Sequence, residues 1–301
     1  MLAGPEEALQ SRSRRIIGEM TAIDAALDGL IDYAGLYPPA ALDMPAAVRN
    51  YVDYQTRARA SMLGRFIVDI ARVAELRAAA GTAVSGMRLS LLAPPTLHAA
   101  QLEEHSDLHI ASLEIKSADP ADVEWLRTQL PSNVECYFEL PLNPIPSETI
   151  QALARSEARA KLRMGGVTPG NIPSAASVID LLAALAQHRV AFKATAGLHH
   201  PIRSCHRLTY AADSPTSTMH GFANLLCAAA ILYFAGSPDE AAAVLQEENP
   251  HSFRIAPHAI GWRTLEWNAE QLHEVRSRFF LSFGSCSFTE PIQDLEALGW
   301  L

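Results

Sequence analysis

The chain has 301 residues and is 49% hydrophobic, so it can bury a large core, and one barrel-sized domain is as natural as two smaller ones. Its formal net charge of -9 and the lack of a basic block argue against binding to nucleic acid or to an acidic membrane surface. An anionic substrate would therefore need a local basic pocket.

The cysteines and the apolar runs indicate a reduced, cytoplasmic protein. Four cysteines are spread along the chain without a Cys-x-x-Cys pair: Cys136, Cys205, Cys227 and Cys286. The N-terminus carries Glu6 and Glu7 and lacks the basic start and apolar run of a signal peptide. The longest apolar run, residues 225–235, is too short to span a bilayer and predicts a buried helix.

Strand-like and helical segments alternate along the whole chain. An amphipathic helix is predicted over residues 5–28. Eight short strands follow, most of them ended by proline or glycine, near residues 30–36, 65–70, 87–92, 109–115, 134–140, 160–166, 191–197 and 278–284. Helical patterns separate them at residues 44–62, 73–80, up to Leu102, from Pro120, and at 147–159, 173–188 and 291–298.

This alternation is typical of an α/β protein with a (β/α)8 TIM barrel. A doubly wound open sheet is the alternative, but it would usually show a glycine-rich turn after the first strand, and none is here. Residues 236–274 contain three prolines and two tryptophans and interrupt the alternation. We interpret them as an insertion before the eighth strand of a single domain, residues 1–301, that acts as a lid or a homo-oligomer contact.

Two strand segments, near Lys161 and Lys193, are joined by the helix at 173–188, so they should be parallel neighbours. Alternate residues of a strand share a face, which puts Arg163 on the face of Lys161 and Thr195 on the face of Lys193. Two lysines and an arginine that converge on one patch repel each other. Such crowding would lower a lysine's pKa and free its amine to attack a carbonyl.

Polar residues at the carboxyl ends of the strands are the candidates for an active site, because barrel enzymes place their chemistry there. They are Asp32, Tyr37, Asp69, Glu114, Lys116, Glu139, Lys161, Arg163, Lys193, Thr195, His199, His200, Ser285, Cys286 and Glu290. A buried ionised group must be paired or must shift its pKa, so this many charges indicate a polar pocket rather than a dry core.

The lysines of the sixth and seventh strands and the stretch at 282–287, Ser-Phe-Gly-Ser-Cys-Ser, resemble parts of the 2-deoxyribose-5-phosphate aldolase family and its class I relatives. The resemblance covers roughly the last half of the barrel. It implies that Lys161 forms a Schiff base, that Lys193 is its perturbing partner, and that Gly284 with Ser285 forms an anion-binding turn.

The chain departs from the family pattern in two places. Leu162-Arg163-Met164 follows the first lysine, where the family has small hydroxyl residues. Gly197-Leu198-His199-His200-Pro201 follows the second, where the family has a paired glycine. An inward Arg163 indicates a carboxylate or phosphate on the substrate, since its planar fork binds either in bidentate fashion. The histidine pair would supply a proton shuttle or signal a metal.

The resulting hypothesis is an aldolase-like lyase that makes or breaks a carbon-carbon bond of a small anionic carbonyl substrate, without a cofactor. Glu114 or Glu139 would carry the proton, and His199 or His200 would act as general acid or base. The candidate catalytic residues are Lys161, Lys193, Glu114, Glu139 and His199. The candidate substrate-binding residues are Arg163, Lys116, Thr195, Gly197, His200, Gly284 and Ser285.

Two other hypotheses stay open. A metal-dependent lyase or isomerase would take its ligands from Glu114, Glu139, His220 and one of the histidines 199 and 200. A non-catalytic barrel would bind an anion, or a partner through residues 236–274. In a structural interpretation, Glu114 simply pairs with Arg163 or Lys193, and the histidine pair is a capped turn before proline.

Overall fold

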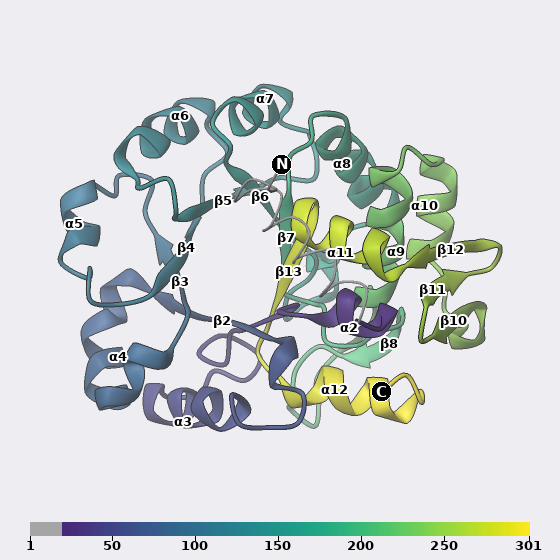
Figure 1. The fold of residues 1–301 in the computed structure, drawn as a ribbon, viewed down its shortest axis with the longest axis horizontal. Helices are drawn as coiled ribbons and strands as arrows, with labels where there is room; N and C mark the ends of the chain where they lie inside the picture. The colour runs from purple at the N-terminus through teal and green to yellow at the C-terminus, as the bar shows by residue number, and fades with distance from the viewer. Residues whose placement is uncertain (1–19) are drawn as a thin grey trace, which may run out of the picture.

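The computed structural model describes residues 20–301. Eight parallel strands close into a barrel in the order β1-β13-β7-β6-β5-β4-β3-β2 (Figure 1). They are β1 (Ile31–Tyr33), β2 (Leu63–Asp69), β3 (Leu89–Ala93), β4 (Ile110–Ile115), β5 (Glu135–Leu140), β6 (Arg159–Arg163), β7 (Phe192–Thr195) and β13 (Phe280–Ser285). The predicted barrel is therefore confirmed, and the open-sheet alternative is wrong.

Helices form an outer ring around the strands (Figure 1). Those that follow β1 to β6 and β13 are α3 (Met44–Tyr54), α4 (Val73–Ala80), α5 (Ala99–Glu103), α6 (Pro120–Gln129), α7 (Ser147–Arg155), α8 (Ala175–Gln187) and α12 (Thr289–Ala297). Side chains cap several of them, as Asp43, Asp119 and Ser174 each accept a backbone N–H from the first turn of the helix that follows. The helix predicted over 44–62 ends earlier, at Tyr54.

The chain between β7 and β13 is longer than the other crossovers. It forms a hairpin of β8 (Ser204–Arg207) and β9 (Thr216–Met219), which was not predicted. The other elements are α9 (Phe222–Tyr233), α10 (Pro238–Leu245), the antiparallel sheet of β10 (Phe253–Ala256), β11 (Ala259–Trp262) and β12 (Leu265–Asn268), and α11 (Ala269–Arg278). The predicted insertion thus spans α10, the sheet and part of α11, and its role as a lid or oligomer contact stays a prediction.

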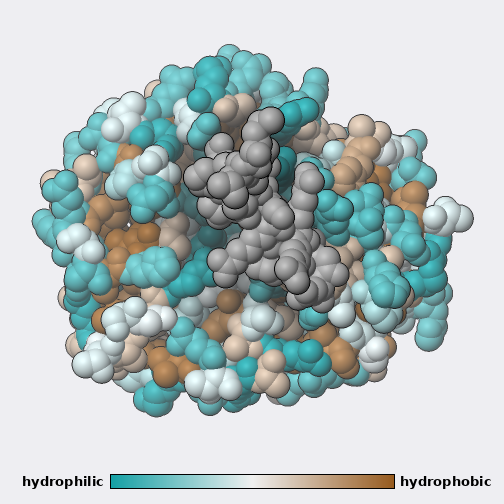
Figure 2. Space-filling view, viewed as in Figure 1, coloured by the Kyte–Doolittle hydropathy of each residue, from teal (hydrophilic) through white to brown (hydrophobic). Residues whose placement is uncertain are grey.

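Helix α9 contains most of the longest apolar run and is buried along its length, as predicted. The N-terminal helix predicted over residues 5–28 is described only as α2 (Ala22–Leu27), and its earlier part lies outside the described residues. Between residues 20 and 301, no helix is long and apolar enough to cross a membrane. Hydrophilic side chains dominate the helical rim of the face shown in Figure 2, with smaller hydrophobic patches between them.

The apolar core lies between the strands and the helices, where Phe192 contacts Phe279 edge-on and stacks on Phe280. The inner face of the barrel is different. Lys161 is the register partner of both Glu139 on β5 and Lys193 on β7, so charged residues of three neighbouring strands lie at one level. The predicted adjacency of the two lysines is confirmed.

Beyond this level, the strands β6 and β7 are followed by two glycines in close contact. Gly197 has φ +71°, and a Cβ built on it would lie 2.7 Å from the Cα of Gly165 and 2.9 Å from the carbonyl oxygen of Met164. A side chain at Gly197 would clash with backbone atoms, which cannot move without a large cost in free energy. The role of Gly197 in substrate binding stays a prediction, but its conformation requires glycine.

Gly197→Ala is therefore expected to lower the free energy of unfolding by about 1–3 kcal/mol, since it combines a strained φ with a backbone clash. Urea unfolding would measure this loss. Gly170→Ala is the matched control, because nothing lies within 4 Å of a Cβ there and its φ is not positive. Equal stability of the two variants would contradict this account of the strand ends.

Candidate active site

Charged side chains form one continuous chain through the barrel, in which basic and acidic residues alternate. In order, its members are Arg159, Glu135, Arg65, Asp32, Lys193, Glu114, Lys161, Glu139 and Arg163. We call these nine residues the interior ion-pair chain. It runs from the N-terminal end of β6, where Arg159 lies, to the C-terminal end, where Arg163 lies.

Lys193 lies at the centre of the interior ion-pair chain and is completely buried. Its Nζ donates to Asp32 Oδ2 at 2.5 Å and to Glu114 Oε1 at 2.6 Å. Burial alone would lower the pKa of Lys193, but the two carboxylates hold it above its ordinary value. Lys193 is therefore a fixed cation at neutral pH, and the structural pairing of Glu114 with Lys193 is confirmed.

The carboxylates on either side of Lys193 also accept hydrogen bonds from groups other than the lysine. Ser282 Oγ donates to Asp32 Oδ2 at 2.8 Å, and the backbone N–H of Arg65 donates to Asp32 Oδ1 at 2.7 Å. Ser90 Oγ donates to Glu114 Oε1 at 2.7 Å. Burial alone would raise the pKa of both acids. The charges of Lys193 and Arg65 hold the pKa of Asp32 below the usual range, and the charges of Lys193 and Lys161, with the Ser90 hydroxyl, do the same for Glu114.

Lys161 is held less firmly than Lys193. Its Nζ lies 3.0 Å from Glu114 Oε2 and 3.1 Å from Glu139 Oε2, and its side chain is 9% exposed. Among the described residues, Glu114 Oε2 has no well-directed hydrogen bond, so its contact with Lys161 is an ion pair without good donor geometry. Lys161 is thus the interior lysine with access to solvent.

The expected crowd of unpaired positive charges is wrong. Glu114 lies between the two lysines and pairs with both through different oxygens. Arg163 does share the face of Lys161, as predicted, but its Nε donates to Glu139 Oε1 at 3.1 Å. The intervening carboxylates therefore offset the repulsion between the cations. The expected activation of the amine depended on that repulsion.

The mouth of the barrel at the C-terminal strand ends has a half-exposed guanidinium and a buried hydroxyl. The Arg163 side chain is 48% exposed. Burial would raise the pKa of Glu139, but Lys161 and Arg163 hold it below the usual range. The hydroxyl of Tyr37 is buried without a hydrogen-bond partner among residues 20–301. Burial, and then the charges of Asp69 and Glu114, raise the pKa of Tyr37, so it is a neutral donor at this mouth.

The predicted histidines pair with acids on α12. His199 Nδ1 lies 3.0 Å from Glu290 Oε2, and His200 Nδ1 lies 2.5 Å from Asp294 Oδ2. The His200 ring also stacks on His206 at 3.4 Å between centroids. Neither predicted histidine is paired with a member of the interior ion-pair chain, so the structure does not bring them together with Lys161.

The ligand set expected for a metal is not assembled. Glu114 and Glu139 are engaged with lysine and arginine, and His220 Nε2 lies 2.9 Å from the carbonyl oxygen of Pro173. Across residues 20–301, no group of three or more His, Cys, Asp or Glu side chains is arranged to hold a metal ion. The metal-dependent hypothesis therefore has no support from the described residues.

The remaining predicted binding residues are spread over the mouth. A Cβ on Gly284 would lie 3.5 Å from Thr195 Oγ1, so these two residues are neighbours near the C-terminal ends of β13 and β7. Ser285 is buried, and its Oγ accepts the backbone N–H of Ser287 at 3.3 Å. Lys116 follows β4 and is exposed. The anion-binding turn at Gly284 and Ser285 stays a prediction.

Sequence reasoning missed Arg65, Ser90, Ser112 and Ser282, which donate within the barrel. Ser112 Oγ donates to Ser90 Oγ at 2.7 Å, which continues the hydrogen bonds that start at Glu114. Each of these residues is an isolated polar side chain in a strand, at a position that alternates with buried apolar neighbours. This period of two was the available signal, because it marks a polar residue that faces the barrel axis.

The use of lysine is itself informative. Of the 24 Lys and Arg residues only three are lysine, namely Lys116, Lys161 and Lys193, and two of them lie inside the barrel. Lysine is compact and can lose its proton, whereas arginine cannot.

Comparison of the sequence with protein-family models and with curated proteins found no match, so the aldolase resemblance depends on residues of this chain alone.

Proposed function

We propose that the protein is a lyase of the class I aldolase type, in which Lys161 forms an imine with a small anionic carbonyl substrate. One observation carries the proposal: Lys161 lies on the C-terminal side of Lys193 in the interior ion-pair chain, its side chain is 9% exposed, and its amine has a carboxylate on each side at 3.0 and 3.1 Å. A nucleophilic amine needs a base within hydrogen-bond reach, and Glu139 meets this requirement. The role of Lys193 changes from perturbing the amine to holding Glu114 in place.

Substrate binding would prepare the amine. Arg163 is half exposed and pairs with Glu139 through a single Nε contact, which leaves its other donors for an incoming carboxylate or phosphate. An anion that draws Arg163 away removes one of the two cations next to Glu139. The carboxylate then becomes a stronger base and takes a proton from the Lys161 ammonium group.

The neutral amine attacks the substrate carbonyl carbon. The ammonium group loses two hydrogens in all, and these leave with the carbonyl oxygen as water, so the iminium ion keeps the single positive charge. The iminium withdraws the electron pair of the neighbouring carbon-carbon bond, while a hydroxyl on the leaving fragment gives its proton to Glu139 and becomes a carbonyl. Protonation of the enamine and hydrolysis then restore Lys161.

Reductive trapping tests the imine directly. The protein is incubated with pyruvate, with dihydroxyacetone phosphate or with neutral acetaldehyde in the presence of cyanoborohydride, and the adduct is located by peptide mass spectrometry. With only three lysines in the chain, assignment is unambiguous. We expect one adduct, on Lys161, and faster trapping of the two anionic carbonyls because they bind Arg163.

Lys161→Arg is the informative variant, because arginine keeps the cation between the two glutamates but cannot form an imine. It should abolish the adduct. Lys116→Arg makes the same exchange at the exposed lysine and should retain it. Modification of Lys116 or of the N-terminal amine alone, or adducts of equal yield in Lys161→Arg, would rule out the proposal.

The non-catalytic barrel is the competing candidate, and the pairing of both interior lysines with carboxylates favours it. A barrel whose lysines serve only as counter-ions would show no trapping with any carbonyl. Under the lyase proposal the cytoplasmic location and a homo-oligomer remain expectations from the sequence. The same trapping experiment therefore separates the two candidates.

A further inference from the structure

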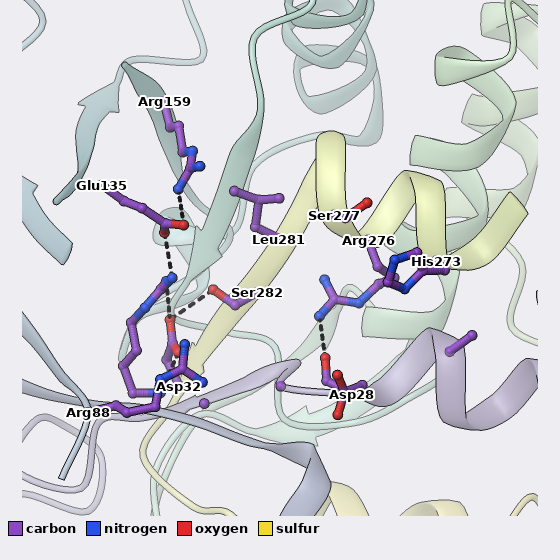
Figure 3. A pocket seen from close by; sticks show the side chains of 14 residues that line it. Asp28, Asp32, Arg88, Glu135, Arg159, His273, Arg276, Ser277, Leu281 and Ser282 are labelled. Carbon is purple, nitrogen blue, oxygen red and sulfur yellow. Dashed lines mark hydrogen bonds and ion pairs between the residues drawn. The ribbon is translucent and has the colours of Figure 1, made fainter. Parts of the chain in front are cut away.

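A cavity of about 260 Å³ lies at the opposite end of the barrel from Arg163. Its wall includes four arginines: Arg65, Arg88, Arg159 and Arg276. Arg65 and Arg159 are at the starts of β2 and β6, Arg88 precedes β3, and Arg276 comes from α11. Figure 3 shows side chains from these separate elements around one space. The lyase proposal assigns this end of the barrel no role.

Two of the arginines belong to the interior ion-pair chain and share their acids. Arg65 and Arg159 both pair with Glu135. Asp32, the next acid, lies 3.9 Å from Arg65 but is also the partner of Lys193. At this end, the two carboxylates of Glu135 and Asp32 are thus the ion-pair partners of three cations: Arg65, Arg159 and Lys193. Arg65 Nε, in a side chain that is nine-tenths buried, has no hydrogen-bond partner among the described residues.

Arg276 adds a buried cation. It is 7% exposed, and it donates to the backbone carbonyls of Ala26 at 2.9 Å, of Asp28 at 3.0 Å and of Phe280. All of its hydrogen bonds within residues 20–301 are to backbone carbonyls, and burial lowers the pKa of Arg276 to about 10. It caps the C-terminal end of α2, so its direct hydrogen-bond partners are backbone carbonyl groups.

Arg88 and two further residues form the rim. Arg88 is exposed and makes no ion pair or side-chain hydrogen bond with residues 20–301, and it lines the same cavity as Asp32 (Figure 3). Asp28 and Ser277 are exposed at the same rim. The wall therefore contains four guanidinium groups and three carboxylates, one of which Lys193 shares. The cavity has an excess of positive charge.

We propose that this cavity binds a small phosphate-bearing anion. Ion pairs at the N-terminal end of a barrel often serve stability alone, but such a role needs neither a hollow nor an unpaired arginine. Guanidinium forks match phosphate oxygens in bidentate geometry. The volume is below that of most drug-sized ligand sites, which restricts the ligand to a phosphate group with a few additional atoms.

Titration calorimetry and thermal unfolding of the full chain with inorganic phosphate test this site, at an ionic strength kept constant with sodium chloride. We expect saturable binding with a dissociation constant of about 1 mM or tighter, and a melting temperature that rises with phosphate. Arg88→Gln and Ser277→Asp should each weaken binding by about tenfold, through loss of a donor and through added negative charge. Both positions are exposed, so neither change should prevent folding.

Arg163→Gln distinguishes the two ends of the barrel, because Arg163 is the half-exposed arginine at the C-terminal mouth. The affinity of the N-terminal cavity for phosphate should be unchanged in this variant. Binding that is lost in Arg163→Gln and retained in Arg88→Gln would place phosphate at the C-terminal mouth and overturn the inference. If sodium chloride at the same ionic strength raised the melting temperature as much as phosphate does, the rise would reflect general charge screening. That result would overturn the inference as well.

Discussion

Lys193→Met is expected to lower the free energy of unfolding by about 3–5 kcal/mol, because it leaves two buried carboxylates without their cation. Lys193 is completely buried, and its Nζ contacts Asp32 at 2.5 Å and Glu114 at 2.6 Å. Methionine fills a similar volume, so the loss comes from the charge rather than from a cavity. Urea unfolding followed by circular dichroism would measure it.

Lys116→Met is the matched control, since the same exchange at an exposed lysine should change stability by less than about 0.5 kcal/mol. The triple variant with Asp32→Asn and Glu114→Gln should regain part of the loss, because both uncompensated charges are then removed. If Lys193→Met were as stable as Lys116→Met, the interior ion-pair chain could not be the framework that positions Lys161.

Acid should destabilise the protein steeply below about pH 4, the range in which unfolded carboxyl groups take up protons. Asp32 and Glu114 have a folded pKa below the usual range, so the unfolded state binds more protons there. Each extra proton costs about 1.4 kcal/mol per pH unit, or about 2.8 kcal/mol per pH unit for the two acids together. This stabilisation is complete above about pH 5 and is lost as the pH falls.

Lys193 acts at the other end of the pH scale. Its folded pKa is raised, so its contribution is complete below about pH 10 and is lost as the pH rises beyond that value. Stability from urea unfolding between pH 2 and pH 11 would show both limits. Glu114→Gln should reduce the acid slope by about 1.4 kcal/mol per pH unit, whereas Glu296→Gln, at an exposed acid, should not. A free energy that stays flat from pH 6 to pH 3 would contradict this account.

Much of the barrel could be predicted from local pattern. The helix predicted over 173–188 is α8, Ala175–Gln187, capped by Ser174, and the strands on either side of it pair in parallel as expected. Local signals also show that Arg163 follows Lys161 on one face. The hairpin of β8 and β9 could not be predicted, because its two short strands are half exposed and lack alternating hydrophobic residues.

The pairing of the interior charges could not be predicted from local pattern. Lys193 is paired with Asp32, which lies 161 residues earlier, and with Glu114, which lies 79 residues earlier. Closure of the barrel brings these strands together. The sequence of any one strand does not indicate which residues of other strands its side chains will contact. Lysines on neighbouring strands therefore suggested repulsion, although Glu114 on β4 lies between them and pairs with both.

The histidines show the same limit. His199 and His200 follow β7, where barrel enzymes place catalytic groups, so a role near Lys161 was a reasonable prediction. The side chains turn to Glu290 and Asp294 on α12 instead. Position along a strand determines which end of the barrel a residue occupies, but the rotamer and the acids of a distant helix determine what it contacts.

The central claim is that Lys161 is the amine that reacts, and NMR of protein labelled at the lysine side-chain carbons tests it most directly. The spectrum should contain three signals, one for each lysine, assigned with Lys→Arg variants. On addition of pyruvate, we expect the Lys161 signal alone to move to an imine position, while the signals of Lys193 and Lys116 stay unchanged. A spectrum in which no signal moves, or in which only Lys116 responds, would contradict the account.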